Sequence, residues 1–245
     1  MKTGTTVLSL SGATKRFGGL VAVDNMDFDV TEHEVMGLIG PNGSGKSTTL
    51  NLISGALKPT SGTISLRGVP ISDLPPQQIS RRGVARTFQL VRLLPSMTVL
   101  ENVKAGAVFG HRRRWGREAE AHAMAMLQKV GLGRQAHAHI GQLTYIDTKR
   151  VELARVLASD PKILLLDEWL AGLNPTELEE GIRLIQALRD EGRTIILVEH
   201  VMDAIRSLCD SCVVMASGAK IAEGTPAEVL SDPEVIRAYL GDDDA

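Results

Sequence analysis

The sequence has few aromatic residues and almost no net charge. Aromatic residues make up 3% of the 245 positions, and the formal net charge at pH 7 is −2. Lysine and arginine are spread along the chain, so we expect no broad basic surface of the kind that binds nucleic acids. The one basic run, HRRR at residues 111–114, we interpret as a solvated face. We therefore predict no nucleic-acid partner.

Cysteine is equally scarce. The chain contains Cys209 and Cys212, which form a single C-x-x-C pattern. A zinc site would need two more ligands, and the sequence has no second pair. A redox pair usually opens a helix after a strand, whereas these cysteines close a helical stretch. We therefore expect two ordinary reduced cysteines.

The sequence also lacks a long apolar run. A membrane-spanning helix needs roughly 18 consecutive apolar residues, and no segment approaches that length. Residues 1–17 lack the apolar centre of a secretory signal. We expect a chain that stays in the cytoplasm unless a partner holds it at a membrane.

What the sequence does contain is an alternation of apolar strands with helices. Strands that are apolar on both faces and alternate with helices predict an α/β fold with a mostly parallel sheet. The main expected strands lie at residues 7–10, 26–30, 35–40, 162–167 and 193–200, and a hairpin turns at residues 217–218. No repeat or linker divides the chain, so we expect one domain over residues 1–245. A helical subdomain is inserted at about residues 90–160.

Residues 40–47, GPNGSGKS, have the spacing of a phosphate-binding loop between a strand and a helix. Three glycines allow the backbone to curl so that successive N–H groups point at phosphate oxygens: Gly40, Gly43 and Gly45. Lys46 is expected to reach the terminal phosphates, and the Ser47 hydroxyl to bind magnesium. This loop predicts a protein that binds a nucleoside triphosphate.

Two acidic residues end the expected strand at residues 162–167, in the sequence KILLLDE. A carboxylate at the end of a buried strand is costly to leave unpaired, so a cation or a donor is expected nearby. Asp167 suits the magnesium shell of a phosphate-binding loop. Glu168 suits the base that orients and deprotonates water. The alternative interpretation is a structural salt bridge.

Two further side chains fit this chemistry, each with an ordinary structural alternative. Gln89 follows a short strand, where a neutral amide can bind magnesium and respond to the γ-phosphate. Glu199 and His200 end the strand at residues 193–200. Sheets that carry a phosphate-binding loop place their chemistry at the carboxyl ends of the strands, where His200 falls.

Residues 143–150, LTYIDTKR, look like a helix start that could hold an anion. Thr144 can cap the helix, and Asp147 follows three residues later. Ile146, however, lies where a phosphate would need bare backbone. The segment is therefore either a modified phosphate-binding turn or only a helix cap.

Together these residues resemble an ABC-type ATPase over nearly the whole chain. GPNGSGKS is similar to the Walker A loop of that family, and ILLLDE is similar to its Walker B strand. Gln89 matches the Q-loop, AGLNP at residues 171–175 the D-loop, and His200 the switch histidine. LTYID stands where the LSGGQ signature belongs, and Phe17 stands where the family stacks an aromatic residue on adenine.

The resemblance implies a P-loop NTPase fold with a mostly parallel core sheet, an antiparallel β amino-terminal subdomain and an inserted helical subdomain. It implies a catalytic role for Glu168, His200 and Gln89, and magnesium binding by Ser47, Gln89 and Asp167. It also implies nucleotide contacts for the rest of the loop and for the signature: Asn42, Ser44, Thr48, Thr144, Tyr145, Ile146 and Asp147.

The sequence between the motifs is similar to the ATP-binding subunits of branched-chain amino acid importers, notably residues 81–103, DEWLAGLNPTE and PEVIRAYLG. Importers for other small polar solutes would look much the same. The resemblance implies an ATPase at the cytoplasmic face of the membrane that dimerises head to tail with a second ATP-binding subunit. It also implies integral membrane permease subunits, docked at residues 90–97, and indirectly a solute-binding protein. The apolar residues of that segment could equally form a buried satellite core.

Two residues depart from the pattern of the family. Ile146 replaces the signature glycine nearest the phosphate, and Trp169 follows Glu168 where proline is common. Because the signature acts on the ATP that the partner's Walker A loop holds, we expect Ile146 to keep the backbone away from that ATP and to slow hydrolysis.

Two other classes of protein compete with a transport ATPase. A soluble ABC-type ATPase of DNA repair or translation would carry long coiled-coil insertions or a second cassette, and 245 residues hold neither. A small-molecule kinase on a P-loop fold would not need Gln89, the LTYID segment and His200.

Overall fold

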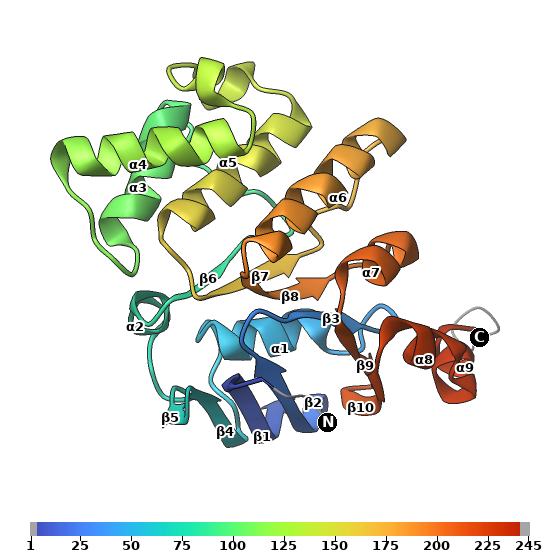
Figure 1. The fold of residues 1–245 in the computed structure, drawn as a ribbon. Coiled ribbons are helices and arrows are strands. Elements are labelled where there is room, and N and C mark those ends of the chain that lie inside the picture. The colour runs from blue at the N-terminus through green and yellow to red at the C-terminus, as the bar shows by residue number, and fades with distance from the viewer. Residues whose placement is uncertain (1–3, 241–245) are drawn as a thin grey trace. The chain divides into compact units, whose positions relative to one another are not determined.

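The structure is a computed structural model that describes residues 4–240 (Figure 1). The chain divides into two compact units. Unit 1 comprises Met1–Pro76 and Ile185–Ala245, and unit 2 comprises Gln77–Leu184. Among the described residues, none of the helices combines the length and the apolar character needed to cross a membrane.

One sheet of unit 1 is antiparallel and has the strand order β2-β1-β4-β5. Its strands are β1 (Thr6–Phe17), β2 (Leu20–Thr31), β4 (Ser61–Leu66) and β5 (Val69–Pro70). The expected antiparallel amino-terminal part is thus confirmed, but β1 and β2 are longer than the pattern predicts. A register shift between Leu10 and Ala13 accommodates the polar residues that interrupt the alternation, because a bulge lets a strand continue past an extra residue.

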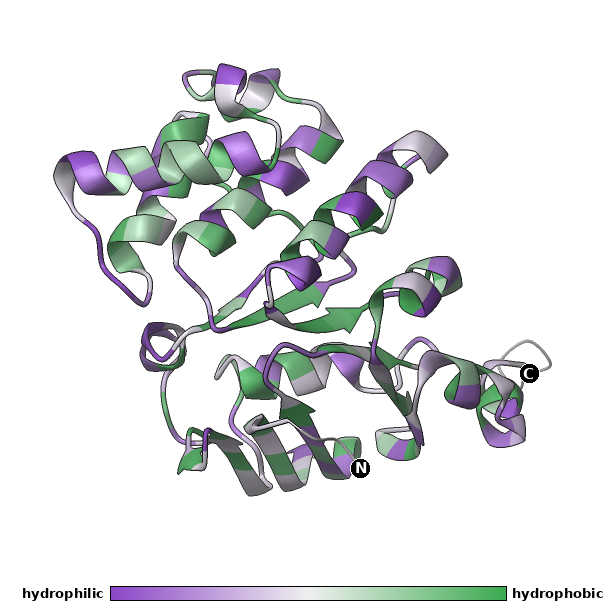
Figure 2. Ribbon diagram, in the orientation of Figure 1, coloured by the Kyte–Doolittle hydropathy of each residue, from purple (hydrophilic) through white to green (hydrophobic). Residues whose placement is uncertain are grey.

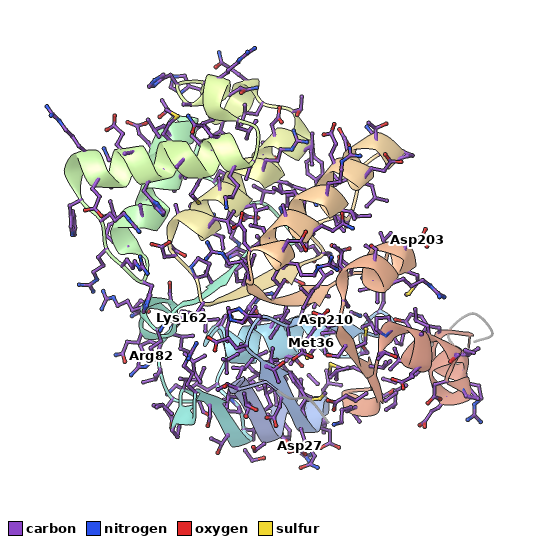
Figure 3. All side chains as sticks on the ribbon, in the orientation of Figure 1. Asp27, Met36, Arg82, Lys162, Asp203 and Asp210 are labelled. Atoms are coloured by element: carbon purple, nitrogen blue, oxygen red, sulfur yellow. The ribbon has the colours of Figure 1, made fainter. Side chains whose placement is uncertain are left out.

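A second set of strands in unit 1 has the order β10-β9-β3-β8. The strands are β3 (Val35–Ile39), β8 (Thr194–Val198), β9 (Ser211–Ala216) and β10 (Ala219–Gly224). β3 runs parallel to β8 and β9, and every residue of β3 and β8 is buried, including Met36 (Figure 3). Figure 2 shows these strands in the colour of hydrophobic residues. Continuous apolar strands of this kind are typical of parallel sheets, which are covered on both faces. The expected hairpin turns at Ser217 and Gly218, between β9 and β10.

Two helices of unit 1 follow its parallel strands β3 and β8, and two follow the β9–β10 hairpin. They are α1 (Lys46–Ile53), α7 (Met202–Leu208), α8 (Pro226–Ser231) and α9 (Pro233–Leu240). Thr225 caps α8 through a reciprocal pair of hydrogen bonds with Glu228. Cys209 ends α7 and Cys212 lies on β9, and both are free thiols.

Unit 2 contains two parallel strands and a group of helices. The strands are β6 (Val84–Arg86) and β7 (Ile163–Asp167). The helices are α2 (Pro76–Arg81), α3 (Val99–Phe109), α4 (Gly116–Lys129), α5 (Tyr145–Ala158) and α6 (Pro175–Asp190), of which α2 and α6 cross the unit boundaries. α3, α4 and α5 pack on one another within the range expected to be helical. α3 begins only at Val99, because Thr98 and Glu101 form a capping box.

The basic run at residues 111–114 is not simply a solvated face. The Arg114 side chain is 14% exposed and forms ion pairs with Asp160 and Glu118. The run therefore helps to fix the connection between α3 and α4 against the end of α5. Spacing could not predict this role, because Asp160 is distant in sequence.

Candidate functional site

The phosphate-binding loop joins β3 to α1 in unit 1, as predicted. Gly40 and Gly45 have φ angles of 148° and 104°. A Cβ at Gly40 would lie 2.0 Å from the Met215 carbonyl oxygen, and one at Gly45 would lie 2.4 Å from that of Ala22. Both positions therefore require glycine. The curled backbone is held in place by close contact with β9 and β2.

Polar groups converge on this loop. Lys46 is 5% exposed, and its ammonium donates to the carbonyls of Gly40 and Pro41 at 2.8 Å each. The buried Ser44 hydroxyl has no hydrogen-bond partner within residues 4–240. The N-cap of α1 is Gly45, and no side chain of the described residues caps the helix. The N–H groups of its first turn are therefore available to a ligand. The loop thus offers donors suited to phosphate oxygens.

A pocket of about 340 Å³ opens at the loop within unit 1. Its lining includes the predicted residues Asn42, Gly43 and Ser44, together with Ser217 of the β9–β10 turn and Arg237 of α9. Sequence reasoning missed Arg237. Its guanidinium donates to the carbonyl of Pro233, one helical turn earlier, and no sequence motif links α9 to the loop.

Phe17 and His200 also belong to unit 1. Phe17 ends β1 and is 46% exposed, so its ring is open to stacking, and the Lys15 ammonium lies 5.1 Å from the ring centroid. His200 follows β8 and is exposed, whereas its neighbour Glu199 is buried. His200, the residue predicted to take part in catalysis, is thus the exposed one of the two.

Asp167 and Glu168 lie in unit 2 at the end of β7. Asp167 is 3% exposed, and its Oδ2 accepts a hydrogen bond from Arg86 at 2.5 Å. Oδ1 is buried and has no hydrogen-bond partner in the described part of the chain. A carboxylate oxygen that accepts no hydrogen bond from the described residues suits a hard cation such as Mg²⁺. Asp167 therefore fits its predicted role as a magnesium ligand. The sequence did not identify Arg86 as its counterion, although Arg86 stands three residues before Gln89.

The structure brings Gln89 and Glu168 together. The Gln89 amide donates to Glu168 Oε2 at 2.6 Å. The Gln89 segment is fixed by Glu152 of α5, which is fully buried and accepts from the backbone N–H groups of Phe88 at 3.3 Å and Arg92 at 3.1 Å. Burial raises the pKa of Glu152. The amide and the carboxylate assigned to catalysis thus form one hydrogen-bonded pair.

The predicted signature segment is the amino terminus of α5. Thr144 is the N-cap, and its hydroxyl accepts from the Asp147 N–H at 3.3 Å. Asp147 also pairs with Arg150 at 3.5 Å. Tyr145 is 54% exposed, and its ring lies 3.5 Å from the position of a Cβ on Gly172 of the D-loop.

Ile146, predicted to keep the signature backbone away from the partner's ATP, is buried within its own chain. Its side chain is 7% exposed, and its backbone is helical rather than in the left-handed region. The exposed side chain at the start of α5 is Tyr145 instead. A strained left-handed turn at Ile146 is therefore absent, whereas the predicted slow hydrolysis concerns the assembled complex and stays a prediction.

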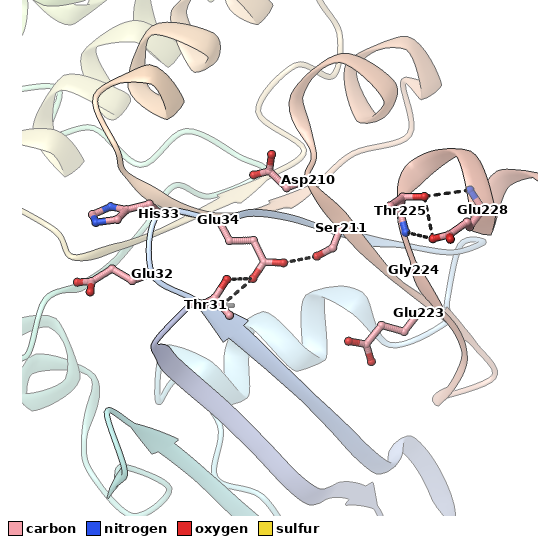
Figure 4. Close-up of a pocket in the computed structure, with 11 residues that line it drawn as sticks. Thr31, Glu32, His33, Glu34, Asp210, Ser211, Glu223, Gly224, Thr225 and Glu228 are labelled. Carbon is pink, nitrogen blue, oxygen red and sulfur yellow. Dashed lines mark hydrogen bonds between the residues drawn. The ribbon is translucent and has the colours of Figure 1, made fainter. Parts of the chain in front are cut away.

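Unit 1 has a second, larger pocket of about 930 Å³, whose lining includes five acidic residues and no predicted site residue (Figure 4). Glu34 is buried there and accepts from the Thr31 N–H and hydroxyl at 2.7 Å each, and from the Ser211 hydroxyl. This network connects the turn after β2 to the start of β9. We interpret it as structural.

The family of the chain follows from comparison with known proteins. A profile described as ABC transporter matches residues 23–171. The chain belongs to the ABC transporter family. A second profile, described as branched-chain amino acid ATP-binding cassette transporter, matches residues 219–245. This ABC protein is accordingly an ATPase of the P-loop α/β class, as predicted.

The relatives of this ABC protein span its length. LivG of Salmonella typhimurium, a high-affinity branched-chain amino acid transport ATP-binding protein, is 44% identical over 96% of this chain and 98% of its own. BraF of Pseudomonas aeruginosa, with the same description, is 42% identical with the same coverage.

Solved structures agree with this assignment. The ADP conformation of MJ1267, an ATP-binding cassette of an ABC transporter, is 31% identical with a TM-score of 0.88 and covers 96% of this chain and 99% of its own. The cassette MJ0796, a dimer bound to ADP and Pi in a post-hydrolysis state, is 29% identical with a TM-score of 0.81. It covers 89% of this chain and 98% of its own.

Replacing Lys46 with alanine should weaken nucleotide binding. It removes the cation at the phosphate-binding loop, and one charged hydrogen bond contributes about 1.5–3 kcal/mol, so the Kd should rise by about tenfold to a hundredfold. Titration of the full chain with a fluorescent ATP analogue measures the change. Lys58→Ala, at an exposed lysine of the same unit, is the control. Equal affinities of Lys46→Ala and the parent would remove Lys46 from the site.

Replacing Ile146 with glycine should destabilise the chain without accelerating hydrolysis. The variant deletes a buried side chain, which costs about 2–5 kcal/mol, and adds the helix penalty of glycine, about 1 kcal/mol. Thermal unfolding and ATP turnover are measured on the same preparation, with Tyr145→Gly as the exposed counterpart. Faster turnover of Ile146→Gly at an unchanged Tm would instead show that Ile146 keeps the backbone away from the partner's ATP.

Proposed function

We propose that this ABC protein is the ATP-hydrolysing subunit of a membrane importer for branched-chain amino acids or a similar small polar solute. The observation that carries the ATPase is the glycine cradle of residues 40–47 with its buried Lys46. The relatives named for branched-chain amino acid transport support the solute class. They give no support to a soluble, non-transport role, and membership of the ABC family excludes the small-molecule kinase.

In the proposed reaction, the loop at residues 40–47 binds the phosphates of ATP through backbone N–H groups and Lys46. Magnesium would be held by Ser47, Gln89 and Asp167, and when bound it supplies positive charge that neutralises the phosphate oxygens. Asp167 is prepared for this role because Arg86 occupies its Oδ2 and leaves Oδ1 open.

Glu168 accepts the proton of the attacking water in this proposal. Its hydrogen bond from Gln89 fixes the direction of the carboxylate before the reaction. His200 assists at the γ-phosphate, and Phe17 stacks on the adenine. A glutamine beside the base can also signal whether nucleotide is present, since any displacement of its amide changes the orientation of Glu168.

The proposal includes a second ATP-binding subunit. The start of α5, residues 144–147, would face the ATP that the partner's loop holds, and would present the N–H groups of its first turn. The dimeric state of the MJ0796 cassette supports this arrangement. Ile146 would contribute its backbone, because its side chain is buried.

Residues 90–97 are the proposed docking surface for the permease at the cytoplasmic face of the membrane. Leu90 is 81% exposed, Leu94 46% and Met97 36%. Apolar side chains this exposed do not form a satellite core, and a contiguous apolar surface often marks an interaction site. Val91 and Leu93 of the same segment are half-buried. A solute-binding protein would act through the permease.

The docking surface can be tested by co-purification. An affinity-tagged full chain should bring down an integral membrane protein from its source membranes. Leu90→Glu combined with Leu94→Glu should abolish this, because the charges would have to be buried in the interface. Val69→Glu, at an exposed apolar residue of unit 1, should leave it unchanged. Parent chain that purifies without any membrane protein would contradict the transport role.

Glu168→Gln tests the proposed base. The amide keeps the shape but cannot accept a proton, so hydrolysis should fall by about 10² or more while ATP still binds. Phosphate release by the assembled complex measures the loss, and Glu179→Gln on the exposed face of α6 is the control. Parent-like turnover would make Glu168 structural.

A further inference from the structure

Lys149 is the least expected buried residue of unit 2. It lies on α5, one turn after the signature segment, and is 2% exposed. It shares the buried side of the helix with Ile146 and Leu153, where an apolar residue would be ordinary. A buried ammonium is retained only where its hydrogen bonds are well satisfied, so its partners indicate what it does.

The partners of Lys149 are backbone carbonyl oxygens. Its Nζ donates to the carbonyls of Ala171 at 2.7 Å, Trp169 at 2.9 Å and Glu168 at 3.4 Å. An ammonium has three N–H donors, so these three oxygens account for all of them. The Tyr145 ring lies 5.1 Å from the same nitrogen and covers it from the start of the helix.

These carbonyls belong to the turn that carries the proposed base. Glu168 has a φ angle of 48°, in the left-handed region that a non-glycine residue adopts only at a cost. The Ala171 N–H closes the turn onto the Glu168 carbonyl at 3.2 Å. Carbonyl dipoles that converge on one point repel one another, and a cation at that point offsets the repulsion. Lys149 therefore stabilises a turn that would otherwise relax.

The link between helix and turn runs in both directions. The Trp169 indole N–H donates to the Lys149 carbonyl at 3.2 Å, and Trp169 is 2% exposed. Trp169 thus replaces the proline common in the family with a residue that can donate back to α5. Lys149 of α5 and Trp169 of the turn are thus joined by two hydrogen bonds of opposite direction, which resist sliding of the helix past the turn.

We propose that Lys149 is a positioning residue for ATP hydrolysis. Its ammonium holds the turn at residues 168–171 in the conformation that directs the Glu168 carboxylate to Gln89. It thereby couples this base to the helix whose start is the signature segment. A displacement of α5 by nucleotide at the partner's loop is transmitted to Glu168 of the same chain. The inference rests on the proposed role of Glu168 as the base.

Lys149→Met tests the inference, because methionine keeps the length of the side chain but removes the charge and the donors. In the assembled complex we expect kcat to fall by about tenfold or more, since a small misplacement of a catalytic group is costly. The KM for ATP and the affinity of the isolated full chain should stay within about twofold, because the phosphate-binding loop is untouched. Lys162→Met, at an exposed lysine at the other end of β7 (Figure 3), is the matched control.

Two further variants separate positioning from mere stability. Lys149→Arg retains the charge and the donors, and its kcat should stay within about threefold of the parent. Trp169→Phe removes the indole donor together with part of a buried side chain, so its Tm should fall, and kcat of the folded variant should fall about threefold. If Lys149→Met does not fold, Trp169→Phe decides. A parent-like kcat of Trp169→Phe would then overturn the inference.

A double-mutant cycle distinguishes this inference from the proposed function. On a Glu168→Gln background, Lys149→Met should cause no further loss of turnover, because it acts through that carboxylate. Additive losses, a parent-like kcat of Lys149→Met, or arginine and methionine variants that are equally slow would overturn the inference. Parent-like turnover of Glu168→Gln alone would instead overturn the proposed base.

Discussion

The close approach of backbone to backbone at Gly40 and Gly45 is the constraint on which unit 1 depends. The carbonyl oxygens of Met215 and Ala22 leave no space for a Cβ at these positions. β9 and β2 therefore press on the loop from two sides and hold its positive φ angles. The curl of the loop, the orientation of its N–H groups and the burial of Lys46 all follow from that packing. The phosphate-binding conformation of the loop is therefore a consequence of the packing of β9 and β2 against it.

In unit 2, the polar groups proposed for catalysis lie at the end of a buried strand. Three buried charges there have specific partners. Arg86 neutralises Asp167, Glu152 accepts from the backbone beside Gln89, and Lys149 donates to the turn after Glu168. Such groups add little net stability compared with apolar residues of the same size, but each fixes a geometry. The Gln89 amide can meet the Glu168 carboxylate because both of their segments are anchored to α5.

The parts of the site that the sequence predicted are those specified by local chemistry. Residues 40–47 were predictable because spacing and glycine content define the loop, and Asp167 because an acidic residue ends an apolar strand. Burial at the start of α5 was not predictable, because the sequence alone did not show which side of the first turn faces the chain's own core. Arg86 and Lys149 escaped notice because their partners are more than 15 residues away, and no local pattern marks a tertiary ion pair or a carbonyl cluster.

The buried Lys149 also bears on why Trp169 replaces the common proline. Proline has no N–H and a fixed φ, so it would stiffen the turn by itself. Tryptophan leaves the backbone free, and Glu168 adopts a left-handed conformation just before it. The turn then needs its rigidity from outside, and the ammonium of Lys149 and the indole of Trp169 supply it by hydrogen bonds to α5. A proline would stiffen the turn permanently, whereas hydrogen bonds from α5 stiffen it only while the helix stays in place. Lysine and tryptophan therefore make the orientation of Glu168 depend on the position of α5.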